Sequence, residues 1–112
     1  MISRHWRGVT RKSAAGRYLR HLRSETFPQL AKLRGYRGFE VHRKAVIDGE
    51  EFVVITFWDS LASIRAFSGR KPERAVVPEP ARVLMVRYEK TARHYRVAER
   101  QPRSTNSTRE KK

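Results

Sequence analysis

The sequence predicts a single α+β domain in which helices cover one face of an antiparallel sheet. Its 112 residues suit one domain. Segments with strand-like and helix-like hydrophobic patterns follow one another in the order β-α-β-β-α-β. A tight-turn dipeptide, Asp48-Gly49, joins the two central strand-like segments. This order is typical of a split β-α-β sandwich.

The first strand and the first helix occupy the N-terminal third of the chain. Residues 2–9 alternate roughly between apolar and basic side chains, which predicts a strand ending near Thr10. Ser13 is expected to cap the following helix, and Pro28 to bend or restart it near residues 26–27. Gly35 is placed to end the helix. The apolar residues at helical spacing are Ala15, Tyr18, Leu19, Leu22, Leu30 and Leu33.

A β-hairpin and a second helix follow. Residues 36–47 and 52–58 are expected to pair as antiparallel strands. Asp59 or Ser60 can cap the second helix, which stops at Gly69. A short helical turn is expected over residues 73–77, and closing strands over residues 83–88 and 94–97. Within the second helix, one face carries Leu61, Ile64 and Phe67.

The second hairpin strand is apolar on both sides, which predicts an oligomer. An antiparallel sheet with one solvated face would alternate apolar and polar residues along this strand. Helices are expected to cover one face, so the other face needs a second copy of the chain in a twofold contact. We therefore expect a homodimer of ferredoxin-like sandwiches that forms a dimeric α/β barrel. The two sets of side chains are Val53, Ile55 and Phe57, and Phe52, Val54 and Trp58.

Composition limits the other possibilities. The net charge of +15 favours anionic partners but is spread along the chain. Residues 1–98 are expected to form the domain and residues 99–112 a disordered basic tail. The chain has no cysteine and no apolar run of signal-peptide or membrane-spanning type, so we expect a cytoplasmic protein without membrane contact. Neither a phosphate-binding glycine loop nor a nucleotide fingerprint is present.

Several segments resemble antibiotic-biosynthesis-monooxygenase domains. They are Phe52-Val-Val-Ile-Thr-Phe-Trp-Asp-Ser60, Ile64-Arg-Ala-Phe67 with Gly69, Gly35-Tyr-Arg-Gly-Phe39 and His94-Tyr95. The resemblance covers roughly residues 1–98 and implies a dimeric α/β barrel. It also implies one of several activities, because some members oxidise aromatic polyketides with dioxygen and no added cofactor, and others degrade haem.

The haem-degrading branch uses an asparagine on the first strand, a tryptophan before the second helix and a later histidine that ligates iron. Trp58 matches the tryptophan, whereas the asparagine position holds His5 or a neighbour, and residues 74–77 contain no histidine. We therefore expect no cofactor and keep haem only as an alternative.

Six residues are candidates for the site. His94 and His5 can transfer a proton from an acidic phenol or hydroquinone. Trp58 and Trp6 offer aromatic surfaces for a planar ligand, although strand tryptophans are more often core residues. Tyr88 and Tyr95 can donate a hydrogen bond to a ligand oxygen. The remaining histidines, His21 and His42, lack metal-ligand spacing and are expected at the surface, so no metal is predicted.

Three functional hypotheses follow. The first is an oxygenase-like enzyme that holds a planar aromatic or polyketide-type substrate between sheet and helices. The second is a non-catalytic dimer that binds a small anionic or aromatic molecule through arginines such as Arg4, Arg87 and Arg93. The third, nucleic-acid binding, has only the charge in its favour, because the aromatic residues lie in core-like strands. No specific nucleic-acid partner is expected.

Overall fold

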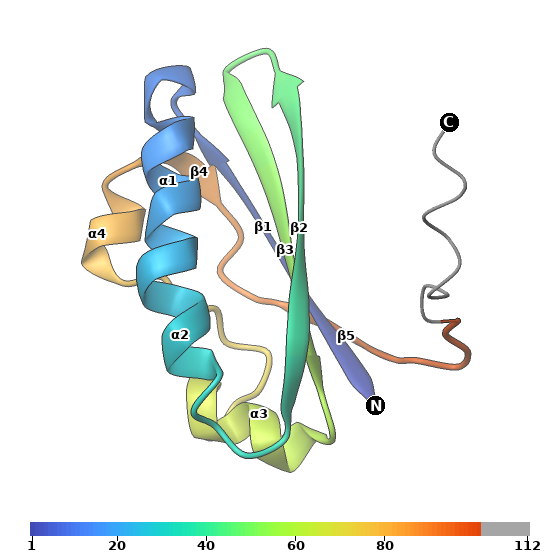
Figure 1. The fold of residues 1–112 in the computed structure, drawn as a ribbon. Helices are drawn as coiled ribbons and strands as arrows, with labels where there is room; N and C mark the ends of the chain where they lie inside the picture. The colour runs from blue at the N-terminus through green and yellow to red at the C-terminus, as the bar shows by residue number, and fades with distance from the viewer. Residues whose placement is uncertain (102–112) are drawn as a thin grey trace, which may run out of the picture.

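Five antiparallel strands form one open sheet in the computed structural model, which describes residues 1–101 (Figure 1). The strand order is β2-β3-β1-β4, and β5 pairs with β1. β4 lies opposite residues 8–10 of β1 and β5 lies opposite residues 2–5, so the two short strands share one edge. This confirms the predicted ferredoxin-like α+β fold. The bounds are β1 (Ile2–Thr10), β2 (Tyr36–Val46), β3 (Gly49–Trp58), β4 (Met85–Tyr88) and β5 (Arg93–Arg96).

The helices lie on one face of this sheet (Figure 1). None of the helices within residues 1–101 has the length and apolar character needed to cross a bilayer. The bounds are α1 (Ala15–His21), α2 (Phe27–Leu30), α3 (Leu61–Ser68) and α4 (Glu79–Arg82).

The first helical stretch runs from Lys12 to Leu30 but changes its geometry three times. It starts with a 3-10 turn, Lys12–Ala14, and Ser13 lies inside that turn and caps nothing, contrary to the prediction. Between α1 and α2 comes a π-helical segment, Leu22–Thr26, in which the amide of Phe27 donates to the carbonyl of Leu22. The restart at Phe27 confirms the predicted effect of the following proline.

The hairpin between β2 and β3 turns one residue earlier than predicted. Val46 pairs with Gly49, so the two loop residues are Ile47 and Asp48 and the glycine belongs to the strand. Gly49 has a packing role: a Cβ there would collide with the carbonyl oxygen of Thr10 on β1. The glycine therefore allows β3 to approach the end of β1 closely.

α3 has the predicted start, whereas the following segment differs from the prediction. Ser60 accepts a hydrogen bond from the amide of Ser63 and forms a reciprocal capping box. Leu61 is exposed, so the buried face consists of Ile64 with Phe67 beside it. The predicted helical turn over residues 73–77 is absent, because residues 73–75 hydrogen-bond to residues 90–92 instead. The short helix forms later, at α4.

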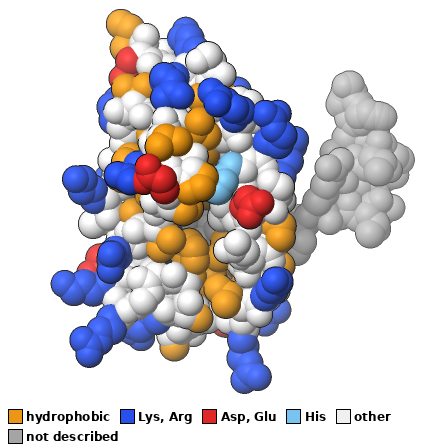
Figure 2. Space-filling model, turned by 90° about the vertical axis from the view of Figure 1, so that its left-hand side faces the viewer, with side chains coloured by type: hydrophobic (Ala, Val, Ile, Leu, Met, Phe, Trp, Pro, Cys, Tyr) orange, Lys and Arg blue, Asp and Glu red, His pale blue; other side chains and the backbone are white. Residues whose placement is uncertain are grey.

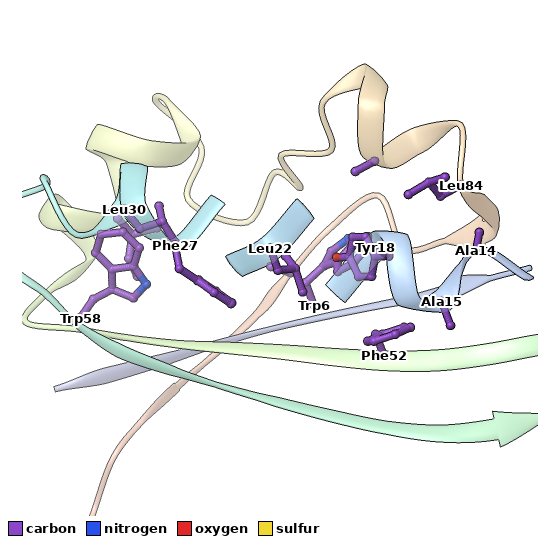
Figure 3. Packing of buried hydrophobic residues seen from close by; sticks show 13 residues of the cluster. Trp6, Ala14, Ala15, Tyr18, Leu22, Phe27, Leu30, Phe52, Trp58 and Leu84 are labelled. Carbon is purple, nitrogen blue, oxygen red and sulfur yellow. The ribbon is translucent and has the colours of Figure 1, made fainter. Parts of the chain in front are cut away.

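The hydrophobic core lies between the helices and the sheet (Figure 3). Phe52 and Trp58 from β3 are fully buried, and Tyr18 on α1 contacts Phe52 edge-on with ring centroids 4.9 Å apart. The cluster of buried residues consists of Trp6, Ala14, Ala15, Tyr18, Leu22, Phe27, Leu30, Phe52, Trp58, Ile64, Ala81, Leu84 and Ala92.

The opposite face of the sheet carries the second set of β3 side chains. Ile55 and Phe57 are nearly buried, and the guanidinium carbon of Arg100 lies 4.7 Å from the Phe57 ring centroid. His5 of β1 and Glu40 of β2 flank Ile55 in the ladder, so the apolar strip is one strand wide. The homodimer predicted from this face stays a prediction, and most of the predicted tail, residues 102–112, lies outside the described part of the chain.

Candidate functional site

A cavity lies between the centre of the sheet and the first helical stretch. Its free volume is about 50 Å³, and aromatic and aliphatic side chains form most of its wall. Figure 2 shows the helical side of the molecule, where hydrophobic side chains gather among Lys and Arg. The lining residues are Arg4, Trp6, Tyr18, His21, Leu22, Thr26, Phe27, Leu30, Val54, Thr56, Phe67, Val76, Val77, Pro78 and Ala81.

An outer groove continues this cavity toward the surface. The groove has a free volume of about 360 Å³ and shares Thr26, Leu30, Phe67, Val76 and Pro78 with the cavity wall. Sites for small organic molecules usually begin at about 300 Å³. The groove is therefore large enough for most of a planar ring system, and the cavity for one edge of it.

Arg4 is the charged group in the cavity wall. It lies on β1 two residues before Trp6, on the same face of the sheet. Arg4 is only 5% exposed and has no carboxylate partner in residues 1–101. Its Nη2 donates to the carbonyl of Arg74 at 2.7 Å, whereas its Nε is buried without a partner. Burial lowers the pKa of Arg4 to about 10, which still leaves it protonated near neutral pH.

The ring of Phe67 lies beneath this cation. The guanidinium carbon of Arg4 is 5.2 Å from the Phe67 ring centroid, which is a cation–π distance. Phe67 in turn stacks on Trp58 at 6.1 Å. The aromatic pair therefore holds the cation at the cavity wall.

The other two arginines of the anion-binding hypothesis already have partners. Arg87 forms a two-pronged ion pair with Asp48, with distances of 2.9 and 3.2 Å. Arg93 pairs with Glu89 at 3.1 Å. Both pairs are at the surface, so Arg4 alone of the three lacks a carboxylate partner among residues 1–101.

Four predicted site residues share the helical face with this cavity. Trp6 lines it, and the indole N–H donates to the carbonyl of Glu89. Trp58 does not line it: the indole lies in the core behind Phe67 and donates to Thr56. Tyr88 contacts Trp6 at 6.3 Å.

His94 lies opposite Arg4 in the β1–β5 ladder, outside the cavity lining. Its Nε2 is buried without a partner. Burial, followed by the charge of Arg4, lowers the pKa of His94 below its usual value. The imidazole is therefore neutral at pH 7.

The other two predicted residues lie on the opposite face of the sheet. His5 and Tyr95 contact each other edge-on with centroids 5.1 Å apart, and His5 Nε2 is 2.9 Å from Ser3 Oγ. Burial is the largest cause that lowers the pKa of His5, followed by the nearby His42 and Arg7. The sheet therefore separates this pair from His94 and Trp6.

One cavity residue, His21, was expected at the surface. The side chain is only partly exposed, lines the cavity, and has a buried Nε2 without a partner in the described chain. The helical pattern contains a signal for this position, because residue 21 lies between the core positions Tyr18 and Leu22.

The cavity residues do not fit a haem group. The cavity volume of about 50 Å³ is far too small for a porphyrin, and no histidine lines the adjoining groove. The histidine expected of the haem-degrading branch is missing from residues 74–77, and the histidine of the cavity, His21, comes from the first helix instead. Within residues 1–101, no three His, Asp or Glu side chains are grouped as metal ligands would be.

Comparisons with known proteins agree with the fold. A model of the antibiotic biosynthesis monooxygenase family matches residues 9–78. No curated protein matches the sequence significantly. A crystal structure from Bacillus cereus, provisionally named an antibiotic biosynthesis monooxygenase, superposes with a TM-score of 0.63 at 16% identity, covering 93% of this chain and 97% of that chain. At this identity the superposition shows a shared fold.

Proposed function

Because the chain belongs to the antibiotic biosynthesis monooxygenase family, we propose that it oxidises a planar aromatic or polyketide-type compound with dioxygen and without an added cofactor. The observation that carries this proposal is Arg4, a protonated guanidinium buried in the wall of a mainly apolar cavity and without a carboxylate partner in residues 1–101. Burying a charge is costly unless something compensates it. A substrate anion would compensate the charge of Arg4.

The reaction asks little of the protein beyond binding and electrostatics. A ring methylene flanked by aromatic carbonyl and hydroxyl groups ionises to an enolate, which can react with dioxygen directly. Overall, the CH₂ group and O₂ give a carbonyl and one water, and the substrate supplies all the electrons. Arg4 would stabilise the enolate oxygen through its free Nε–H, and the low polarity of the cavity would strengthen that contact.

The aromatic side chains would orient the ring. Trp6, Phe27 and Phe67 supply flat apolar surfaces around the cavity, and the groove beside Pro78 is open to the surface. Tyr88 and Trp58 would not touch the substrate. They would fix the positions of Trp6 and Phe67, because Tyr88 packs on Trp6 and Trp58 stacks on Phe67. His94 and His5 remain the proton-transfer groups predicted from the sequence.

The test uses dithranol, a hydroxylated anthrone with an acidic ring methylene. Oxygen uptake and the absorbance of the quinone product are followed for the wild type, Arg4→Met and Arg87→Met, with heat-denatured protein as the correction for autoxidation. We expect Arg4→Met to lose about 10²-fold or more in rate, as with the loss of one oxyanion donor. Arg87→Met, which removes a surface arginine, should match the wild type. Wild-type protein that does not exceed autoxidation contradicts the proposal.

A second candidate function is the binding of an aromatic anion without turnover. It is favoured by the positions of His94 and His5, which lie outside the cavity lining. Saturable quenching of tryptophan fluorescence by dithranol, lost in Arg4→Met and not accompanied by oxygen uptake, would support this function over the first.

A further inference from the structure

We propose that His21 takes the proton from the substrate in this cavity and passes it to solvent. This inference rests on the proposed function, because it assigns the base that forms the substrate anion. From the sequence, the proton-transfer role was expected on His94 and His5, and His21 was expected at the surface.

The cavity has two unpartnered nitrogen atoms. Among the lining side chains in residues 1–101, Arg4 Nε and His21 Nε2 are buried without a hydrogen-bond partner. The other buried polar groups there are occupied, because Trp6 donates to Glu89 and Thr56 accepts from Trp58. Arg4 can only donate, whereas a neutral imidazole nitrogen can accept a proton. The two atoms are therefore chemically complementary.

The imidazole of His21 reaches from the cavity to the surface. His21 is the last residue of α1, and its ring stacks on Tyr18 with the planes 18° apart. The Nε2 atom is buried. The Nδ1 atom is not buried and makes no hydrogen bond to residues 1–101, so it contacts solvent. A ring with one nitrogen inside and one outside can move a proton between them by exchanging tautomers.

The π-helical segment places this ring. It begins directly after His21, and both Leu22 and Thr26 of the segment line the same cavity. Single π-helical turns widen a helix and occur frequently at functional sites. Here the wider turn puts His21, Leu22 and Thr26 on the cavity wall together.

The proton transfer conserves atoms and electrons. The substrate C–H bond breaks, the proton moves to His21 Nε2, and the electron pair stays on the ring as an enolate beside Arg4. The enolate adds dioxygen, and the resulting peroxide takes the proton back at its outer oxygen. Loss of the second C–H proton then forms the carbonyl, breaks the O–O bond and releases water. No other oxidant or reductant is needed.

The experiment separates proton transfer from oxidation by excluding air. Dithranol is mixed anaerobically with the wild type, His21→Gln, His94→Gln and His42→Gln. Binding is read from quenching of tryptophan fluorescence, because Trp6 lines the cavity, and ionisation from the absorbance of the dithranol anion. His42 is a matched control, because it is exposed and paired with Glu40 on the other face of the sheet.

We expect His21→Gln to bind dithranol with an unchanged dissociation constant but to lose the anion signal. In air its kcat should fall by about 10²- to 10⁴-fold, the usual contribution of a general base. His42→Gln should match the wild type in both readouts. Anion formation that persists in His21→Gln, or that is lost in His94→Gln instead, would overturn the assignment.

The two proposals can fail independently. A wild type that forms the anion without air but consumes no oxygen above autoxidation contradicts the oxygenase function and leaves the role of His21 intact. A wild type that accelerates oxidation while His21→Gln keeps its full rate contradicts only the role of His21.

Discussion

Replacing the buried arginine of the cavity by methionine should leave the fold intact or stabilise it. Burial lowers the pKa of Arg4 from 12.5 to about 10, and each tenfold change in an ionisation constant corresponds to about 1.4 kcal/mol. The charged side chain therefore destabilises the folded state by about 3 kcal/mol. A methionine of similar length would occupy the same wall without that cost.

Two favourable contacts of Arg4 would be lost in Arg4→Met. The charged hydrogen bond to the carbonyl of Arg74 contributes about 1.5–3 kcal/mol, and the cation–π contact with Phe67 about 0.5–1 kcal/mol. Against a relief of about 3 kcal/mol, the free energy of unfolding should change by roughly −1 to +1 kcal/mol. Truncating one partner of a buried ion pair would instead cost about 3–5 kcal/mol.

The assay is guanidinium denaturation followed by circular dichroism, with Arg87→Met as the surface control. The free energy of unfolding and its denaturant slope are compared for the three proteins. A loss above about 2 kcal/mol at an unchanged slope would refute the reasoning. Such a loss would mean that the contacts of Arg4 stabilise the fold by more than its burial costs. The buried charge would then be explained by stability alone, without a bound ligand. Unchanged stability with lost turnover would mark Arg4 as a residue retained for function.

Four further predictions concern other parts of the chain. Ser60→Ala should lower the free energy of unfolding by about 1 kcal/mol, and Ser13→Ala should leave it unchanged, because only Ser60 caps a helix; thermal denaturation compares the two. In the same assay, Gly49→Ala should lower the free energy of unfolding by more than about 2 kcal/mol, because the new Cβ would collide with the carbonyl of Thr10. Gly16→Ala, on a helix surface with open space around it, should raise the free energy of unfolding by about 0.5–1 kcal/mol. Equal effects of the two substitutions would argue against the close approach of β3 to β1. His94, whose pKa is lowered on folding, should contribute stability that is fully present above the unfolded pKa near 6.5 and is lost as the pH falls through the folded value; His94→Gln should therefore weaken the decline in stability below pH 6.5. Sedimentation should find a dimer for the wild type and a monomer for Ile55→Glu, because Ile55 lies in the apolar strip of the helix-free face; a monomeric wild type would contradict the predicted homodimer.

Local patterns in the sequence were sufficient to predict the strands, the two main helical stretches and their order, but not α4 or the π-helical segment. The alternation around Phe52 and Trp58 reports which side chains share a face, because a strand has a period of two. Of the two predicted caps of α3, Asp59 and Ser60, it is Ser60 that caps the helix, and a second serine three residues later completes its capping box. Ser13 looked equivalent locally, but the carbonyl of Arg11 accepts from the amide of Ala14 and closes a 3-10 turn around it. The competing backbone turn has no clear sequence signal.

The site could be predicted only in part, because it depends on contacts between distant segments. Of the two neighbouring candidates on the first strand, His5 and Trp6, it is Trp6 that lies on the face that carries the cavity. Whether His21 lines the cavity depends on how residues 76–81 fold against the first helical stretch, which ends 46 residues earlier in the chain, at Leu30. Arg4 was one of many arginines in the sequence. Only the structure shows that Arg87 and Arg93 have carboxylate partners while Arg4 has none among residues 1–101.

The π-helical segment absorbs one extra residue without turning the second half of the helix away from the sheet. The core residues Leu22 and Phe27 are five positions apart, and each residue of a regular α-helix turns the chain by about 100°, so in a regular helix they would point in different directions. The wider π turn lets both face the sheet. Deleting one residue of the segment would leave them four positions apart, so a regular helix would keep Phe27 and Leu30 on the core. In relatives, a one-residue gap at this point should therefore coincide with a regular helix whose second half keeps its packing.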